Sequence, residues 1–450
     1  MRIAKPDLSW DARAVTIVRD HKLGIWMTGA LVVGSMIGSG IFMLPVSLAP
    51  LGANAVLGWV VSILGALAIA FSLASLSRTG EGGIRAYIER AFGPAPAFLV
   101  AWALFWSNIA AQAALAIATA SAASSLFPAL GGASGIVAVG VGSVILLTLV
   151  NLRGVRTSGA LSLLTVVIKI LPLLAVVAFL ATRQISGVPF ERLASSPLTL
   201  ANIATATALT LFALTGFENA TAPVDKVRNP ARTIPRAILG GAALVGLIYL
   251  VSSSGVMLLL PADRIATSPA PYADVIALKW GHHAASLAAL AIAISAFGAL
   301  NSLMFGTGEL GYAMGLRGDL PPVIARTGHD NIPYVAHVIS GAMTIVLILA
   351  NSSKATASLF TFVILLSTAA VLVVYAVGAL AAWQENASPV SRVIFGVALL
   401  FILFAVYGAG MEADLWCLAL LAVGLPIRVI SRWLSDSIPA AEMSPAAPRE

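Results

Sequence analysis

The stretch Gly34-Ser35-Met36-Ile37-Gly38-Ser39-Gly40-Ile41-Phe42 places three glycines and two serines inside an otherwise apolar run, residues 23–48. A run of this length can cross a bilayer, which takes about 20 apolar residues. Backbone that leaves the helical path inside a membrane is tolerated only where it lines a cavity or is buried against protein. We therefore interpret Gly38-Ser39-Gly40 as a break within a membrane-spanning helix.

A second break of this kind is predicted at Thr215-Gly216-Phe217-Glu218, in the sixth apolar run of the chain. Paired breaks at corresponding places in two halves of a chain are the best sequence indication of a transporter's binding site. For the first break alone, the spacing of Gly34 and Gly38 has a simpler explanation, which is close packing of two helices. The matching second break favours a binding site.

The composition indicates an all-α integral membrane protein. Of the 450 residues, 59% are hydrophobic and only 10% are charged, whereas soluble proteins average about 25% charged residues. The single cysteine, Cys417, excludes an intrachain disulfide or a cluster of thiolate ligands. Twelve apolar runs are predicted to span the membrane: 23–48, 55–76, 95–127, 135–152, 157–181, 198–224, 233–260, 282–316, 333–350, 355–383, 391–409 and 415–431.

Lysine and arginine are distributed unevenly between the two sides of these runs. Of the 26 such residues, most lie in the two terminal segments or in the loops that follow the even-numbered runs. The positive-inside rule then places both termini in the cytoplasm, and we expect a multi-pass protein of the bacterial inner membrane. The same bias explains the net charge of +7 without a nucleic-acid partner.

The chemistry of the first break suits an α-amino acid. Backbone N–H groups of Ser39 and Gly40 would open the second half-helix, and a helix N-terminus attracts anions such as a carboxylate. Carbonyl groups around Ser35 and Met36 would end the first half-helix and would suit an ammonium group. One break can therefore hold both ends of the ligand.

Glu218 and Lys169 are ionisable residues deep within predicted spans, where such residues are costly and usually functional. Glu218 in the second break either takes part in ion coupling or accepts hydrogen bonds that hold the broken helix, and the sequence does not decide between these roles. Lys169 in the fifth run could take the place of a coupling cation or carry a proton. Snorkelling to the interface is the weaker alternative, because Lys169 is 12 residues from the start of its run at Thr157.

Other polar residues give further candidates for coupling or gating. Asn108 and Gln112 lie one turn apart on the third run and share a face; they line the cavity or join helices, and joining helices is favoured. Tyr375 could gate the site, although an aromatic residue in a span more often serves packing. The histidines show no metal-ligand spacing, and no glycine-rich phosphate loop occurs, so we expect neither a metal nor a cofactor.

Four segments together resemble the amino acid–polyamine–organocation superfamily, especially its bacterial basic amino acid/polyamine antiporters. They are Gly38-Ser39-Gly40-Ile41-Phe42, the segment 82–94, Gly216-Phe217-Glu218 with 227–235 after it, and 312–321. The resemblance implies alternating access and a five-plus-five inverted repeat with helices 1 and 6 broken. It divides the chain into an N-terminal arm (1–22), a transporter core (23–383), two further spans (384–433) and a disordered tail (434–450).

The resemblance also implies a substrate site. The substrate carboxylate would bind Ser39 and Gly40, and its amino group would bind carbonyls of Met36, Phe212 and Thr215. The full set of expected binding residues is Met36, Ile37, Gly38, Ser39, Gly40, Phe212, Ala213, Thr215, Gly216 and Leu303.

Two departures from the family affect the expected substrate. Phe212 and Leu303 fall where the arginine/agmatine antiporter has tryptophans that stack on a guanidinium, so cation–π recognition is weakened. Lys169 is absent from that antiporter but is similar to a lysine in relatives that move neutral amino acids. Both observations shift the prediction from arginine toward smaller or neutral amino acids.

The sequence therefore predicts a secondary amino-acid transporter, either an exchanger or a proton-coupled permease, and not an enzyme. A polyamine or arginine/agmatine-type antiporter is the alternative within the same class. A membrane sensor that binds amino acids without transport is the alternative from another class, and a membrane enzyme lacks a cluster of acid, base and nucleophile. The expected partners are the substrate and the lipid bilayer, with protons and a second copy of the chain as further candidates.

Overall fold

A computed structural model describes residues 24–38, 40–76, 83–153, 155–217, 227–328, 332–385 and 388–436. Within these ranges the regular elements are α-helices and short 3-10 turns, and no strand occurs among them, which confirms the all-α class. The α-helices are α1 Ile25–Met36, α2 Gly40–Leu48, α3 Ala53–Leu76, α4 Gly83–Phe92, α5 Pro94–Leu126, α6 Ala133–Asn151, α7 Val155–Ile185, α8 Leu200–Leu214, α9 Pro230–Leu259, α10 Ala262–Thr267, α11 Pro271–Leu316, α12 Tyr334–Ala350, α13 Thr356–Glu385, α14 Pro389–Ala409 and α15 Met411–Asp436.

Many of these helices suit a membrane. Nine helices in the described part of the chain are long and apolar enough to cross a bilayer, and α1 with α2 forms a tenth span bent by 49°. Helices α8 and α12 are also apolar but have only 15 and 17 residues. The protein is thus a multi-pass membrane protein, while the number of twelve spans stays a prediction.

One boundary of the sequence prediction agrees closely with the structure. Helix α11 spans Pro271 to Leu316 but is kinked at Gly281, where the backbone is not helical and φ is +81°. A left-handed φ is open mainly to glycine, so the helical path is bent there. The predicted span 282–316 begins directly after this bend.

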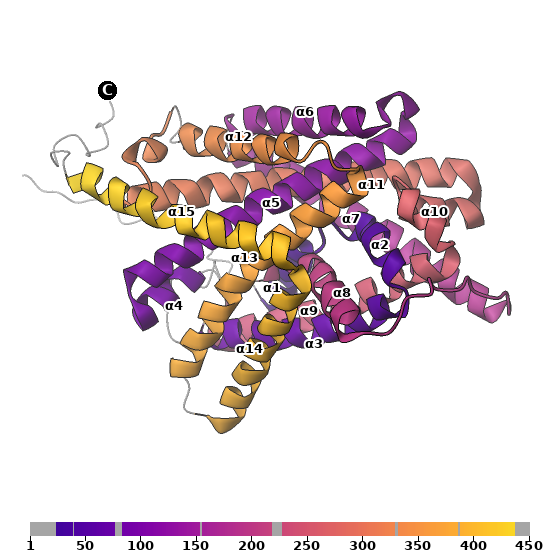
Figure 1. Ribbon diagram of the computed structural model, residues 1–450, viewed down its shortest axis with the longest axis horizontal. Helices are drawn as coiled ribbons and strands as arrows, with labels where there is room; N and C mark the ends of the chain where they lie inside the picture. Colours follow the sequence, from indigo (N-terminus) through magenta and orange to yellow (C-terminus); the bar gives the residue numbers. More distant parts are fainter. Residues whose placement is uncertain are drawn as a thin grey trace, which may run out of the picture.

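The long helices α5 and α11 pack along one another and form one side of the molecule with α6, α7 and α12 (Figure 1). On the other side, α3 packs against α8, α9 and α14. Helix α13 contacts both α5 and α3, and α2 lies among α5, α8, α9 and α11. The half-helix that follows the first break is therefore at the centre of the fold.

A buried ion-pair network holds one end of the molecule, the end at which α4 lies in Figure 1. Asp319, which follows α11, is 2.6 Å from a guanidinium nitrogen of Arg85 on α4 and 3.1 Å from Nε of Arg428 on α15. Arg428 also donates to the carbonyl of Pro94, 2.8 Å away, at the start of α5. Because Asp319 is almost fully buried, loss of its charge would leave two arginines uncompensated, which costs about 3–5 kcal/mol in comparable buried pairs.

Candidate functional site

The two predicted breaks meet in the structure although they are 181 residues apart in the chain. The Ser35 hydroxyl at the end of α1 donates to the Gly216 carbonyl over 3.0 Å. Gly216 has a φ of +109°, and a Cβ at this position would lie 2.7 Å from the Ser35 carbonyl oxygen. The second break therefore requires glycine for two reasons, its backbone conformation and its close approach to the first break.

The start of α2 is covered by an aromatic ring. A Cβ on Gly40 would lie 2.5 Å from Cε1 of Phe212, so the Phe212 ring rests directly on the first residue of this half-helix. The N-terminus of a helix carries free N–H donors and positive partial charge. A carboxylate held there would lie beside the Phe212 ring. Ile37 is buried, Gly38 has open space around it, and Ser39 lies outside the described residues.

The carbonyl groups expected to bind an ammonium already have intramolecular donors. The Met36 carbonyl accepts from the Tyr249 hydroxyl at 3.2 Å and from the Gly38 N–H at 2.8 Å. The Phe212 carbonyl accepts from the Thr215 hydroxyl at 2.8 Å and from its N–H at 3.3 Å. Since a carbonyl oxygen has two lone pairs, an ammonium would replace one of the two hydroxyls, each of which can rotate away.

Tyr249 was not among the residues predicted from the sequence. It lies on α9, is fully buried, and packs against Trp59 of α3 with ring centroids 5.9 Å apart. The signal that could have found it is a tyrosine in the middle of an apolar run, because a buried phenol needs a hydrogen-bond partner.

The remaining predicted binding residues form the surroundings of the breaks. Ala213 is buried beside Phe212, and Leu303 is half-buried on α11, a helix that packs against α2. Tyr375 on α13 is fully buried, and its ring stacks on Phe217 with centroids 5.5 Å apart. Tyr375 thus packs on the residue that follows Gly216.

The break is more accessible from the side of α1 than from the side of α2. Every residue from Gly40 to Val46 in α2 is buried. By contrast, Trp26 near the start of α1 is 89% exposed, and Ser35 at its end is exposed although it lies at the break. The residues of α2 are therefore shielded, whereas α1 is exposed at its start and at the break.

The predicted coupling and gating residues lie in different surroundings. Lys169 is only 5% exposed on α7, and no hydrogen bond or ion pair to it is found in the described part of the chain. Gln112 donates to the Thr307 hydroxyl at 2.8 Å and accepts from the Thr344 hydroxyl at 2.9 Å, so it joins α5, α11 and α12. Asn108 is half-buried one turn before Gln112, and Glu218 lies outside the described residues.

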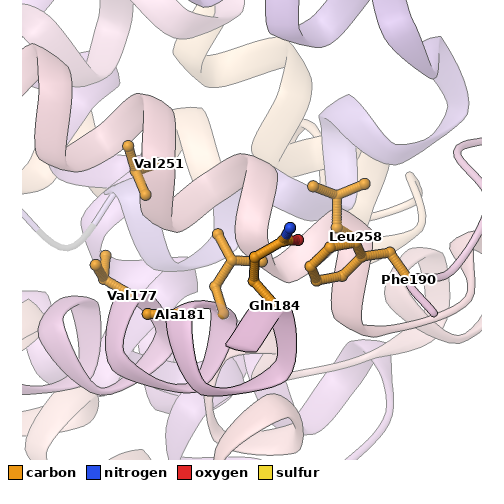
Figure 2. Close-up of a pocket in the computed structure, with 7 residues that line it drawn as sticks. Val177, Ala181, Gln184, Phe190, Val251 and Leu258 are labelled. Carbon is orange, nitrogen blue, oxygen red and sulfur yellow. The ribbon is translucent and has the colours of Figure 1, made fainter. Parts of the chain in front are cut away.

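A separate hollow of about 400 Å³ lies between α7 and α9. Figure 2 shows side chains from both helices facing each other across it, with Phe190 at one end. Its lining is apolar except for one amide: Val177, Leu180, Ala181, Gln184, Phe190, Val251 and Leu258. Because this lining has no charged group, it does not fit a zwitterion, and the paired breaks are the better candidate site.

Comparisons with known proteins identify the family of the chain. The chain matches the amino acid permease family over residues 23–428. It is 26% identical to a putrescine transporter of Haemophilus influenzae over 410 residues, which cover 88% of this chain and 94% of the relative. It is 27% identical to the putrescine transporter of Escherichia coli K12 over 418 residues (88% and 93%) and 28% identical to the cadaverine/lysine antiporter of the same organism over 347 residues (75% and 77%). The chain therefore belongs to the amino acid permease family and is a secondary membrane transporter.

Proposed function

We propose that the protein moves α-amino acids across the bacterial inner membrane by alternating access, as an exchanger or as a proton-coupled permease. The observation that carries this proposal is the contact between the two breaks, where Ser35 bonds to Gly216 and Phe212 covers Gly40. This contact supports the proposal, because a half-helix N-terminus suits a carboxylate and the carbonyl groups at the breaks suit an ammonium.

A diamine or polyamine antiporter is the second candidate, because relatives of the chain are named for putrescine and for cadaverine and lysine. A diamine has no carboxylate to use the N-terminus of α2, which favours an amino acid as at least one substrate. Phe212 and Leu303 provide no tryptophan for cation–π stacking, which favours a small or neutral amino acid. A sensor without transport activity is not favoured, because the relatives are transporters.

Counterflow in proteoliposomes tests the function. Vesicles loaded with an unlabelled amino acid should accumulate the same amino acid in radiolabelled form, and vesicles loaded with cadaverine test the diamine alternative. Phe212→Trp should improve the handling of arginine relative to leucine if Phe212 contacts the substrate side chain. Failure of the wild type to exchange any amino acid or diamine would reject the proposal.

We propose Lys169 as the group that couples transport to protons or replaces a coupling cation. Its burial without a described partner supports this role, because an ammonium in such a place is costly unless it is used. Lys169→Ala should abolish transport or remove its dependence on a pH gradient, and Lys279→Ala on the partly exposed part of α11 is the control. Uptake by Lys169→Ala with an unchanged pH profile would exclude the coupling role.

The proposal also covers two further residues, the topology and the assembly. Glu218 and Asn108 are proposed to act in coupling or gating, both termini are proposed to face the cytoplasm, and a homodimer is the proposed assembly. Glu218→Gln should alter the pH dependence of uptake or trap one facing state. An unaltered profile would reduce Glu218 to a structural hydrogen-bond acceptor.

A further inference from the structure

A second hollow of about 550 Å³ lies at the end of the molecule opposite the Asp319 network, where α10 is found in Figure 1. Five parts of the chain enclose it: the last turn of α2, the 3-10 turn after it at Pro50, α10, the start of α13 with Lys354 just before it, and the turn between α14 and α15. Its volume is within the range of small-molecule sites, about 300–1,000 Å³. Under the proposed topology this end faces away from the cytoplasm.

The hollow has one charge of each sign. Nζ of Lys354 lies 2.7 Å from Oε1 of Glu412, and it also lies 4.2 Å above the ring centroid of Phe362. All three residues line the hollow. Glu412 is directed there because Gly410, with a φ of +86°, turns the chain between α14 and α15.

Hydroxyl groups add to the polar part of the lining. The Thr361 hydroxyl donates to the Ala357 carbonyl at 2.8 Å, so in its 2.7 Å contact with Ser47 it is the acceptor and Ser47 is the donor. The oxygen of Ser47 keeps acceptor capacity. Ser358 is exposed on the same wall. Val46, Phe362 and Leu365 add apolar side chains to the lining.

The ion pair can be opened at little cost. The side chains of Lys354 and Glu412 are 30% and 64% exposed, and exposed ion pairs contribute little to stability. A ligand with its own carboxylate and ammonium would replace the Lys354–Glu412 ion pair by two ion pairs, one with Lys354 and one with Glu412. Its side chain would contact the Phe362 ring. A diamine offers no partner to Lys354 and would place a like charge beside it.

We propose that this hollow is a second, outer binding site for a free α-amino acid, with the ligand carboxylate on Lys354 and the ligand ammonium on Glu412. The inference goes beyond the site at the helix breaks and rests on the proposed function only for the class of ligand. Ser47 at the outer end of α2 and Gly40 at its inner end belong to the same buried half-helix. A ligand in the outer site therefore contacts the half-helix that forms the central site.

The experiment measures binding stoichiometry for pairs of probes that differ by one carboxylate. L-leucine is compared with isopentylamine, and L-lysine with cadaverine, by equilibrium binding to the full-length protein in nanodiscs. Whichever of the two amino acids the protein transports should bind to the wild type at two sites per chain. The matching amine should show one site at most.

Lys354→Met removes the charge and keeps an aliphatic chain over Phe362, and Glu412→Gln removes the opposite charge. Each should reduce the stoichiometry for the amino acid from two to one, with little change in unfolding temperature. Lys279→Ala is the matched control, because Lys279 lies over an aromatic ring, Phe179, but takes no part in the hollow. This control should keep two sites.

A stoichiometry of one in the wild type, or of two in Lys354→Met, would overturn the outer site while leaving the central site intact. A wild type that binds none of the probes would overturn both proposals. Phosphatidylethanolamine also has an ammonium and an anionic group, so binding is repeated with and without this lipid. A second amino-acid site found only in its absence would assign the hollow to the lipid headgroup and overturn the proposal.

Discussion

The two halves of the first span, α1 and α2, have similar apolar compositions but very different surroundings. Neither contains a charged residue. Helix α2 packs against α5, α8, α9, α10, α11 and α13, whereas α1 packs mainly along α9. Among the described residues, the break thus separates a half packed against six helices from a half packed mainly along α9. We expect α1 to be held less firmly than α2.

The largest loss of transport and stability is expected at Gly216, where the second break contacts the end of α1. Gly216→Ala combines a φ of +109° with a Cβ only 2.7 Å from the Ser35 carbonyl oxygen. A non-glycine residue in a strained backbone region costs about 1–3 kcal/mol, and the backbone contact adds to this cost. Counterflow by Gly216→Ala should fall about tenfold or more, and the unfolding temperature in detergent should also fall.

Gly187→Ala is the control for this substitution. Gly187 has a φ of +67° with nothing within 4 Å of its Cβ position, so it contributes the strain of a positive φ without the contact. If Gly187→Ala reduced stability as much as Gly216→Ala, the positive φ alone would explain the loss of stability. The contact between the breaks would then add nothing to it.

A smaller effect is expected at the start of α2. Gly40→Ala would place a methyl group 2.5 Å from Cε1 of Phe212, so the Phe212 ring would have to shift. Overpacking of this kind costs about 1–3 kcal/mol, here mainly in binding because the ring can shift. The KM for the amino acid should rise about fivefold or more with a smaller change in unfolding temperature.

Gly38→Ala tests the same break where a Cβ meets nothing within 4 Å, and its KM should stay within about twofold of wild type. An equal rise in KM for both variants would mean that the break needs flexible backbone and that the contact with Phe212 is unimportant.

The sequence predicted the breaks but not what joins them. Glycine within an apolar run indicates interrupted backbone regardless of the neighbours, so Gly38–Gly40 and Gly216 could be found from residue type alone. The Ser35–Gly216 bond and the Tyr249–Met36 bond depend on how helices rotate and pack, which a single sequence does not determine. The same holds for Asp319, because its partners Arg85 and Arg428 come from the first and last parts of the chain.

Residue type and helical spacing suggested roles for residues but not their contacts. Gln112 was expected to join helices or to line the cavity. Its hydrogen bonds to Thr307 and Thr344 join helices. Tyr375 was expected to gate or to pack, and it stacks on Phe217. Their roles in coupling or gating stay predictions, as do those of Glu218 and Ser39, which lie outside the described residues.

A moderate effect is expected where α1 meets its one main neighbour. A Cβ on Gly241 of α9 would lie 2.7 Å from Cγ1 of Val32, whereas a Cβ on Gly240 would meet nothing within 4 Å. Gly241→Ala should therefore push α1 away from α9 and change the transport rate a few-fold, while Gly240→Ala should not. Cysteine labelling at Ser35→Cys, with Cys417 replaced, should become faster in Gly241→Ala. Unchanged labelling would contradict a loosely held α1.

The smallest effect is expected from Ser35→Ala. The Ser35 hydroxyl contacts both the Gly216 carbonyl at 3.0 Å and the Val32 carbonyl at 2.9 Å, and Ser35 is exposed. Its loss leaves the Gly216 carbonyl without this donor, but water that reaches an exposed site can replace it. A typical hydrogen bond contributes only about 0.5–1.5 kcal/mol, so transport should change less than about threefold.

Ser62→Ala is the matched substitution in the core of the molecule. The Ser62 hydroxyl is fully buried between α3 and α8, 2.8 Å from the Thr207 carbonyl and 2.6 Å from the Thr210 hydroxyl. Water cannot replace it there, so the unsatisfied partners should lower the unfolding temperature more than Ser35→Ala does. The reverse order would mean that the end of α1 is as firmly held as the core, and it would contradict the expected difference between α1 and α2.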